Sequence, residues 1–185
     1  MYKINNLNSK ALFKIIGILL IILAIMMISN LLIEKTIEAF SPNKKSLPIY
    51  CVDTDEKKIA ISFDAAWGND DTDDLLKILD EYDIKSTFFL VKMWVEKYPD
   101  DVKKILEAGH DIGNHSTTHP HMTKISEDEM KKELMDAHEA VKNLTGYEMD
   151  LFRPPFGDYN DKLLKVCKEC GYYAIQWDVE SLVIK

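Results

Sequence analysis

Three of the chain's five histidines lie within seven residues, in the segment Gly113-Asn-His115-Ser-Thr-Thr-His119-Pro-His121. Two imidazoles four residues apart can reach one metal ion from a single turn of chain, so His115 and His119 are candidate metal ligands. Pro120 disfavours the helical region for His119, which predicts a turn or a helix end there. His121 is interpreted as a surface group. The alternative is an exposed His-rich loop that binds no metal.

An acid and a guanidinium follow two other apolar runs. Asp64 comes directly after Lys58-Ile-Ala-Ile-Ser-Phe63, and Arg153 follows Leu151-Phe152 and precedes two prolines. An acid at a strand end can serve as a general base, and Arg153 could pair with such an acid and orient it. The alternatives are an Asp that caps the next helix and a surface Arg beside a rigid loop.

The cysteines form a third, weaker pattern. Cys51, Cys167 and Cys170 are an odd number, which does not predict a disulfide framework. Cys167 and Cys170 have the CxxC spacing of redox and zinc sites, but no second pair of ligands accompanies them. The apolar residues around them indicate an ordinary helix, and a redox site stays as the alternative.

The segments between these candidates alternate between strand and helix patterns. Residues 58–63 and 85–91 are short apolar runs typical of buried strands, and residues 72–82 between them carry Leu and Ile at helical spacing. Ser126 and Glu129 form a capping-box pattern that begins a helix running to about residue 144. Further helices are predicted over 99–108 and 161–170, and further strands over 111–113, 151–153 and 172–177.

This alternation predicts an α/β fold with a parallel sheet, open or closed as a barrel. Because the carboxyl ends of parallel strands meet at one edge of a sheet, we expect the polar residues that follow the strands to lie together there. These residues are Asp64, Asn114, His115, Arg153 and Asp178.

The composition is that of one globular domain with an apolar appendage. The 185 residues are 46% hydrophobic and 29% charged, and 31 acidic against 23 basic residues give a net charge of −8. An acidic chain is poorly suited to phosphate backbones, so no nucleic-acid partner is expected.

The appendage is at the N-terminus. Residues 15–33 are apolar for nineteen residues, about the length that crosses a hydrocarbon core, and three lysines but no acids occur before Glu34. The positive-inside rule then places residues 1–14 in the cytoplasm. The sequence predicts a transmembrane signal anchor in the cell membrane, a linker over 34–57 and an extracytoplasmic domain over 58–185. A cleaved signal peptide is the alternative.

Together the motifs resemble the NodB homology domain of carbohydrate esterase family 4, the polysaccharide deacetylases, and more narrowly its membrane-anchored, sporulation-associated members. The resemblance runs from about Lys58 to Leu182 and implies a deformed (β/α) barrel. It also implies removal of N-acetyl groups from an amino-sugar polysaccharide, and the outward topology favours peptidoglycan. Its carriers are Ile61-Ser-Phe-Asp-Ala-Ala-Trp-Gly68, Gly113-Asn-His-Ser-Thr-Thr-His-Pro120, Arg153-Pro-Pro-Phe-Gly157 and Gln176-Trp-Asp-Val-Glu-Ser-Leu182.

The resemblance implies roles for individual residues. His115 and His119 would hold a divalent metal, zinc or cobalt, that polarises the acetamide carbonyl for attack by water. Asp64 would be the base that takes the water's proton, and Arg153 would support Asp64. The backbone N–H of Phe156 would stabilise the oxyanion.

Two departures from the family pattern lead to further expectations. The family has a second Asp as metal ligand where this chain has Ala65, and we take Asp70 as the substitute third ligand. The alternative is that Asp70 and Asp71 are solvated acids that cap the following helix. The chain also ends at Lys185, before the family's late Leu-x-His motif, so a C-terminally truncated chain with an incomplete barrel is expected. An inactive deacetylase fragment and a non-catalytic wall-binding module are therefore alternatives to an active hydrolase.

Overall fold

The computed structural model describes residues 9–40 and 46–180 of the chain. The chain divides into two compact units, Met1–Lys44 and Lys45–Lys185. Parts of three predicted segments lie outside the described residues: residues 1–8 of the cytoplasmic N-terminus, residues 41–45 of the linker and residues 181–185 of the domain.

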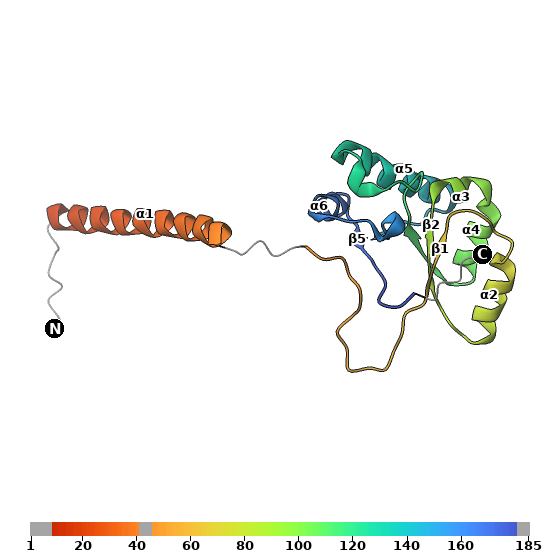
Figure 1. The fold of residues 1–185 in the computed structure, drawn as a ribbon. Coiled ribbons are helices and arrows are strands. Elements are labelled where there is room, and N and C mark those ends of the chain that lie inside the picture. The colour runs from red at the N-terminus through yellow and green to blue at the C-terminus, as the bar shows by residue number, and fades with distance from the viewer. Residues whose placement is uncertain (1–8, 41–45, 181–185) are drawn as a thin grey trace. The chain divides into compact units, whose positions relative to one another are not determined.

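The described part of the first unit is a single helix, α1 (Ser9–Phe40), drawn in red and orange in Figure 1. It continues through residues 34–40, which were expected to belong to a linker, because nothing in that stretch breaks the helix before Phe40. Among the residues that the structure describes, no helix is both long enough and apolar enough to cross a membrane. The predicted transmembrane helix over 15–33 is therefore not supported.

The second unit is built on a parallel sheet, which confirms the predicted α/β class. Within residues 46–180 the strands follow one another in chain order across the sheet, and no pairing joins β1 to β5, so the sheet is open there. The colours in Figure 1 run across the sheet in the same order. The strands are β1 (Ser62–Ala65), β2 (Thr87–Leu90), β3 (Asp111–Asn114), β4 (Leu151–Phe152) and β5 (Tyr173–Ala174).

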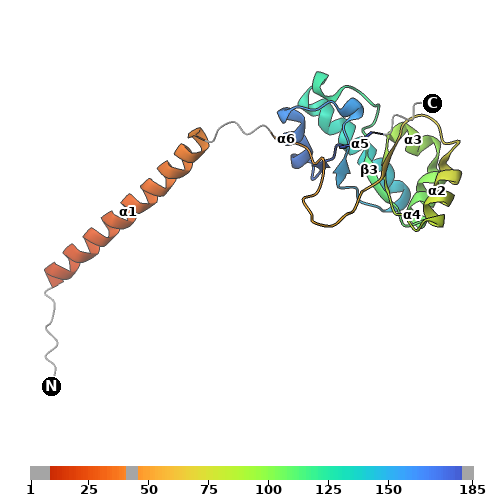
Figure 2. The same ribbon diagram turned by 60° about the horizontal axis from the view of Figure 1, so that its bottom comes forward.

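Helices connect the strands and lie around them in both views (Figures 1 and 2). The predicted capping box is present at Ser126 and Glu129, and the helix that it begins ends at Gly146 in the left-handed conformation that glycine adopts readily. A short helix directly after β2 was not predicted, because six residues are too few for a helical period to stand out. The helices are α2 (Thr72–Glu81), α3 (Lys92–Lys97), α4 (Pro99–Glu107), α5 (Glu127–Thr145) and α6 (Asp161–Glu169), with 3₁₀ turns η1 (Met122–Lys124) and η2 (Pro155–Gly157).

The domain begins earlier than the predicted boundary at residue 58. Ile49 forms a parallel bridge with Ile175, since the Ile49 amide donates to Ala174 O and its carbonyl accepts from Gln176 N, each at 2.8 Å. By contrast, Ile59 is 88% exposed, and β1 starts only at Ser62. Apolar composition predicted the strand near the right place, but pairing with a neighbouring strand decides where it starts.

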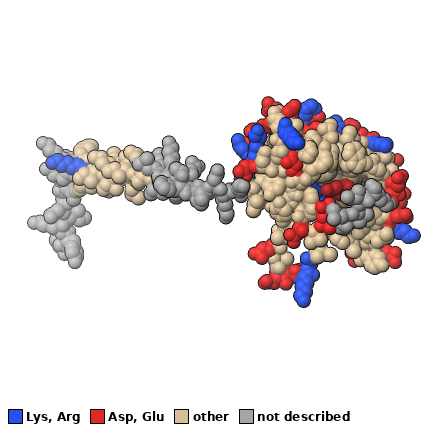
Figure 3. Space-filling model, viewed as in Figure 1, with Lys and Arg blue, Asp and Glu red and all other residues tan. Residues whose placement is uncertain are grey.

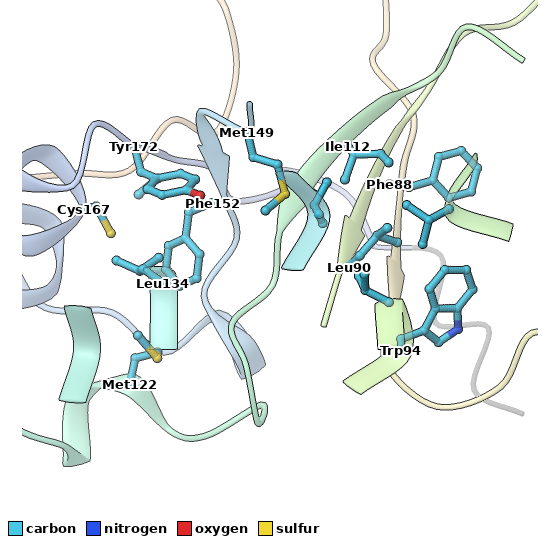
Figure 4. Close-up of a cluster of buried hydrophobic side chains, with 14 of the residues drawn as sticks. Phe88, Leu90, Trp94, Ile112, Met122, Leu134, Met149, Phe152, Cys167 and Tyr172 are labelled. Atoms are coloured by element: carbon cyan, nitrogen blue, oxygen red, sulfur yellow. The ribbon is translucent and has the colours of Figure 1, made fainter. Parts of the chain in front are cut away.

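Charged side chains of both signs lie across the visible face of the domain (Figure 3), while the helices turn their apolar faces inward. Strand side chains such as Leu90 and Ile112 pack with Trp94 of α3 and Leu134 of α5 in one buried cluster (Figure 4). Each fully buried large apolar side chain contributes about 1.5–3 kcal/mol. This core holds the strand ends, and with them the candidate site, in fixed positions.

Cys167 lies in the same core, to the left of Tyr172 and Phe152 in Figure 4. Burial raises the pKa of the Cys167 thiol to about 12 and also raises that of Cys170. A thiol with a raised pKa is a poor nucleophile and metal ligand near neutral pH. The structure therefore favours packing over redox chemistry for the CxxC pair.

Candidate active site

Arg153 connects two strands that are not neighbours in the sheet. It follows β4, and its Nη1 donates to Asp64 Oδ1 on β1 at 2.7 Å, while Nη2 donates to Ser62 Oγ at 2.8 Å. The guanidinium lies over the Phe89 ring of β2, 4.1 Å from the ring centre. A 5% exposed Arg that is stacked and hydrogen-bonded in this way has few alternative positions, so it holds the Asp64 carboxylate in place.

Gly113 of β3 makes room for this arrangement. It lies opposite Phe89 in the sheet, and a Cβ at position 113 would fall 2.4 Å from the Phe89 ring. Only a residue without a side chain leaves space there for the ring on which Arg153 rests.

His115 is buried at the end of β3, on the other side of Asp64. Its Nδ1 donates to Arg153 O at 2.7 Å, since a carbonyl oxygen only accepts, and its Nε2 lies 3.8 Å from Asp64 Oδ2. Burial lowers the pKa of His115, although the Asp64 charge acts in the opposite direction. A neutral ring with Nδ1–H leaves the Nε2 lone pair free toward Asp64, which is the usual arrangement of a metal-binding imidazole.

His119 joins His115 through a tight turn. The two ring centres are 4.9 Å apart, and burial also lowers the pKa of His119. Ser116 and His119 both adopt positive φ, 73° and 58°, and the His119 amide donates to Ser116 Oγ at 3.0 Å. The HxxxH segment is thus a turn rather than a helix, as Pro120 predicted.

Buried polar side chains hold this turn. Asn114 donates to Leu134 O at 2.8 Å and to the Tyr172 hydroxyl at 3.0 Å, and its Oδ1 accepts from Ser116 N at 2.8 Å. The Glu133 carboxylate accepts from the amides of residues 117 and 118, each at 2.8 Å. Asn114 was expected here from its place at a strand end. No sequence pattern pointed to Glu133 or Tyr172, because both are distant from the turn in the chain.

Phe156 approaches the same turn from η2. It has φ 60°, is 61% exposed, and its ring packs 4.6 Å from His119 and stacks 4.2 Å from His121, measured between ring centres. Its amide belongs to the first turn of η2, where N–H groups have no acceptor within the helix. His121 is exposed, as its interpretation as a surface group predicted, and its ring also stacks on Phe156.

The residues fit a metal ion only in part. His115 and His119 offer two imidazoles, but within the described residues no group of three or more His, Cys, Asp or Glu side chains is arranged to hold a metal. Asp70, the predicted third ligand, is not grouped with them. Its charge acts instead on Lys97, whose pKa is raised mainly by Tyr98 and to a smaller extent by Asp70. The Ala65 methyl cannot coordinate a metal either.

The buried Arg153 pairs with the partly exposed Asp64 carboxylate beside two imidazoles whose pKa values are lowered. At the carboxyl edge of a parallel sheet, this arrangement is suited to acid–base chemistry. The family model of the polysaccharide deacetylases matches residues 52–175. The chain belongs to this polysaccharide deacetylase family.

Individual relatives agree with the family. A peptidoglycan-N-acetylglucosamine deacetylase of Bacillus cereus is 34% identical over 68% of this chain and 46% of its own length. The peptidoglycan-N-acetylmuramic acid deacetylase PdaA of Bacillus subtilis is 35% identical over 70% of this chain and 50% of its own length. The chain thus spans about half the length of these curated relatives.

A solved structure adds a different kind of relative. A CE4 family pseudoenzyme from Bacillus anthracis is 33% identical, with a TM-score of 0.69 over 71% of this chain and 47% of that one. A mutant of that pseudoenzyme is described as having restored enzymatic activity. The family therefore contains both active and inactive proteins that share this fold.

Proposed function

We propose that the domain removes N-acetyl groups from peptidoglycan. The observation that carries the proposal is the Asp64 carboxylate, which Arg153 holds at 2.7 Å while its other oxygen faces His115 Nε2 at 3.8 Å. The side chain of Asp64 is 36% exposed, so substrate and water can reach it. The names of the Bacillus cereus and Bacillus subtilis relatives support the substrate class.

In this proposal each residue has one task. Asp64 accepts the proton of the water that attacks the acetamide carbon, and Arg153 keeps the carboxylate oriented toward that water. The Phe156 amide donates to the carbonyl oxygen as negative charge develops on it. A divalent metal, zinc or cobalt, would be held by His115 and His119 and would polarise the same carbonyl.

The test is acetate release by the full chain from peptidoglycan and from N-acetylglucosamine oligomers, with added zinc or cobalt. Asp64→Asn keeps the side chain's shape but removes the base, so we expect a loss of about 10²- to 10⁴-fold. Asp70→Asn is the matched control and should release acetate at the original rate. Release by the original chain no faster than by Asp64→Asn would overturn the proposal.

A second candidate function is glycan binding without turnover. Two observations favour it: His115 and His119 have no third His, Cys, Asp or Glu grouped with them in residues 9–40 and 46–180, and the chain is similar to the Bacillus anthracis pseudoenzyme. Retention of the full chain on peptidoglycan, without acetate release at any zinc or cobalt concentration, is the result that this candidate predicts.

The place of action is part of the same proposal. Peptidoglycan lies outside the cytoplasmic membrane, so we infer an extracytoplasmic domain that works during spore formation, as the sequence resemblance implies. Attachment through residues 15–33 stays a prediction. Protease treatment of intact cells should cleave the domain, and carbonate extraction separates an attached chain from a released one. A domain protected from protease would contradict this location.

A further inference from the structure

Two large aromatic side chains beside the acid–imidazole site are open to solvent. Trp67 is 72% exposed and Phe156 is 61% exposed. Both rings nevertheless pack on the same imidazole, since the ring centre of His119 lies 5.9 Å from Trp67 and 4.6 Å from Phe156. Exposed apolar rings that gather around a polar site mark a binding surface more often than isolated exposed residues do.

The backbone beside Trp67 is held in place although its ring is not covered. Trp94 of the buried core donates its indole N–H to Gly68 O at 2.7 Å, and Asn69 donates to Asp101 Oδ2, also at 2.7 Å. A loop that is anchored on two successive residues presents the ring in one position. Its exposure therefore does not follow from a loose loop.

The backbone around Phe156, which is far from Trp67 in the sequence, is also held in place. It lies between a pair of prolines and Gly157, whose carbonyl accepts from Gln176 Nε2 at 3.2 Å. A bulky residue with φ 60° is strained, at a cost of about 1–3 kcal/mol, and such residues cluster at functional sites. Burial of the ring does little to offset this strain, because most of the Phe156 ring is exposed to solvent.

The chemistry around the rings favours an uncharged ligand with flat apolar faces. Asp64, beside the imidazoles, is paired with Arg153, so its charge is balanced, and Asp158 lies 3.7 Å from His121. The pyranose ring of N-acetylglucosamine carries no charge, and the C–H groups on one face of such a ring can stack on an aromatic side chain.

We propose that Trp67 and Phe156 form an aromatic platform that binds the sugar rings of an N-acetylated glycan at the Asp64–His115–His119 site. The platform deepens the proposed function and rests on it for the identity of the glycan. In this proposal Trp67 contributes to glycan affinity and takes no part in the proton transfer, which Asp64 carries out.

The experiment is calorimetric titration of the full chain with a hexamer of N-acetylglucosamine. Trp67→Ala should weaken binding roughly five- to tenfold, the loss expected for one aromatic contact, and Trp67→Phe should recover most of it. Phe156→Leu keeps the backbone amide and should weaken binding to a similar extent. Tyr82→Ala removes an aromatic ring of similar exposure (67%) at the end of α2 and should bind as the original chain does.

A Trp67→Ala affinity equal to that of the original chain would overturn the platform, and so would the absence of measurable hexamer binding by the original chain. Tighter binding of a single-stranded DNA oligomer than of the hexamer would also overturn it, because bases stack on aromatics too. Acetate release separates the two proposals. Hexamer binding without acetate release would refute the deacetylase function but not the platform. Acetate release with an unchanged KM in Trp67→Ala would refute the platform but not the deacetylase function.

Discussion

Gly113→Ala should damage the site through the sheet rather than through any catalytic group. The new Cβ would lie 2.4 Å from two atoms of the Phe89 ring, and Phe89 is 1% exposed, so the ring has no open space into which it can move. Overpacking of this kind costs about 1–3 kcal/mol. A shifted Phe89 also displaces the guanidinium that lies 4.1 Å above it, and with it the 2.7 Å bond from Arg153 to Asp64.

Urea unfolding at neutral pH measures the cost directly. Gly68→Ala is the matched control, because the nearest atom to its new Cβ is 3.9 Å away and Gly68 has no positive φ, so we expect it to be neutral or slightly stabilising. Combining Gly113→Ala with Phe89→Leu should cost less than the sum of the two single changes, because the smaller side chain relieves the clash. Equal unfolding free energies for Gly113→Ala and Gly68→Ala would refute the reasoning.

Three further predictions concern the site and its surroundings. Arg153→Lys loses the forked contact with Asp64 and Ser62, so acetate release should fall by about 10²-fold, and unchanged release would count against the positioning role. Ala65→Asp should raise cobalt affinity, measured by equilibrium dialysis, whereas Ala66→Asp is the control expected to change it little. Burial lowers the pKa of His110 from its ordinary 6.5, and the positive charge of Lys85 lowers it further. The Nδ1 of His110 accepts a hydrogen bond from Ser86 N at 3.2 Å. The unfolded chain therefore binds the proton more readily, and the unfolding free energy should fall as pH drops below about 6.5; His110→Leu should flatten that slope, and an identical slope would contradict the assignment.

Much of the domain could be predicted from local patterns. The capping box at Ser126 and the glycine after α5 bounded that helix to within about a residue, because caps act on neighbouring backbone groups. Asp64, His115 and Arg153 were expected at one edge because each follows an apolar run, and parallel strands bring such positions together. The structure confirms that these three residues meet.

Contacts between residues that are far apart in the sequence could not be predicted and are seen only in the folded structure. The pairing of Ile49 with Ile175 joins residues that are far apart in sequence, and no local pattern distinguishes residue 49 from the expected linker. The same holds for Glu133, which supports the HxxxH turn from α5, and for His121, whose contact with Phe156 depends on the path of η2.

Asp70 shows most clearly what residue spacing cannot decide. It was expected as a third ligand, but among the described residues it is not grouped with His115 and His119, because whether a carboxylate reaches a metal depends on the three-dimensional path of the chain. For Cys167, the apolar neighbours predicted an ordinary helix, and the buried side chain in α6 confirms that prediction. Sequence alone determined the family, the order of the strands and of every helix of the domain except α3, and the residues Asp64, His115 and Arg153 at the strand ends. Only the tertiary structure decided which side chains share a site, because that depends on long-range packing that residue spacing does not encode.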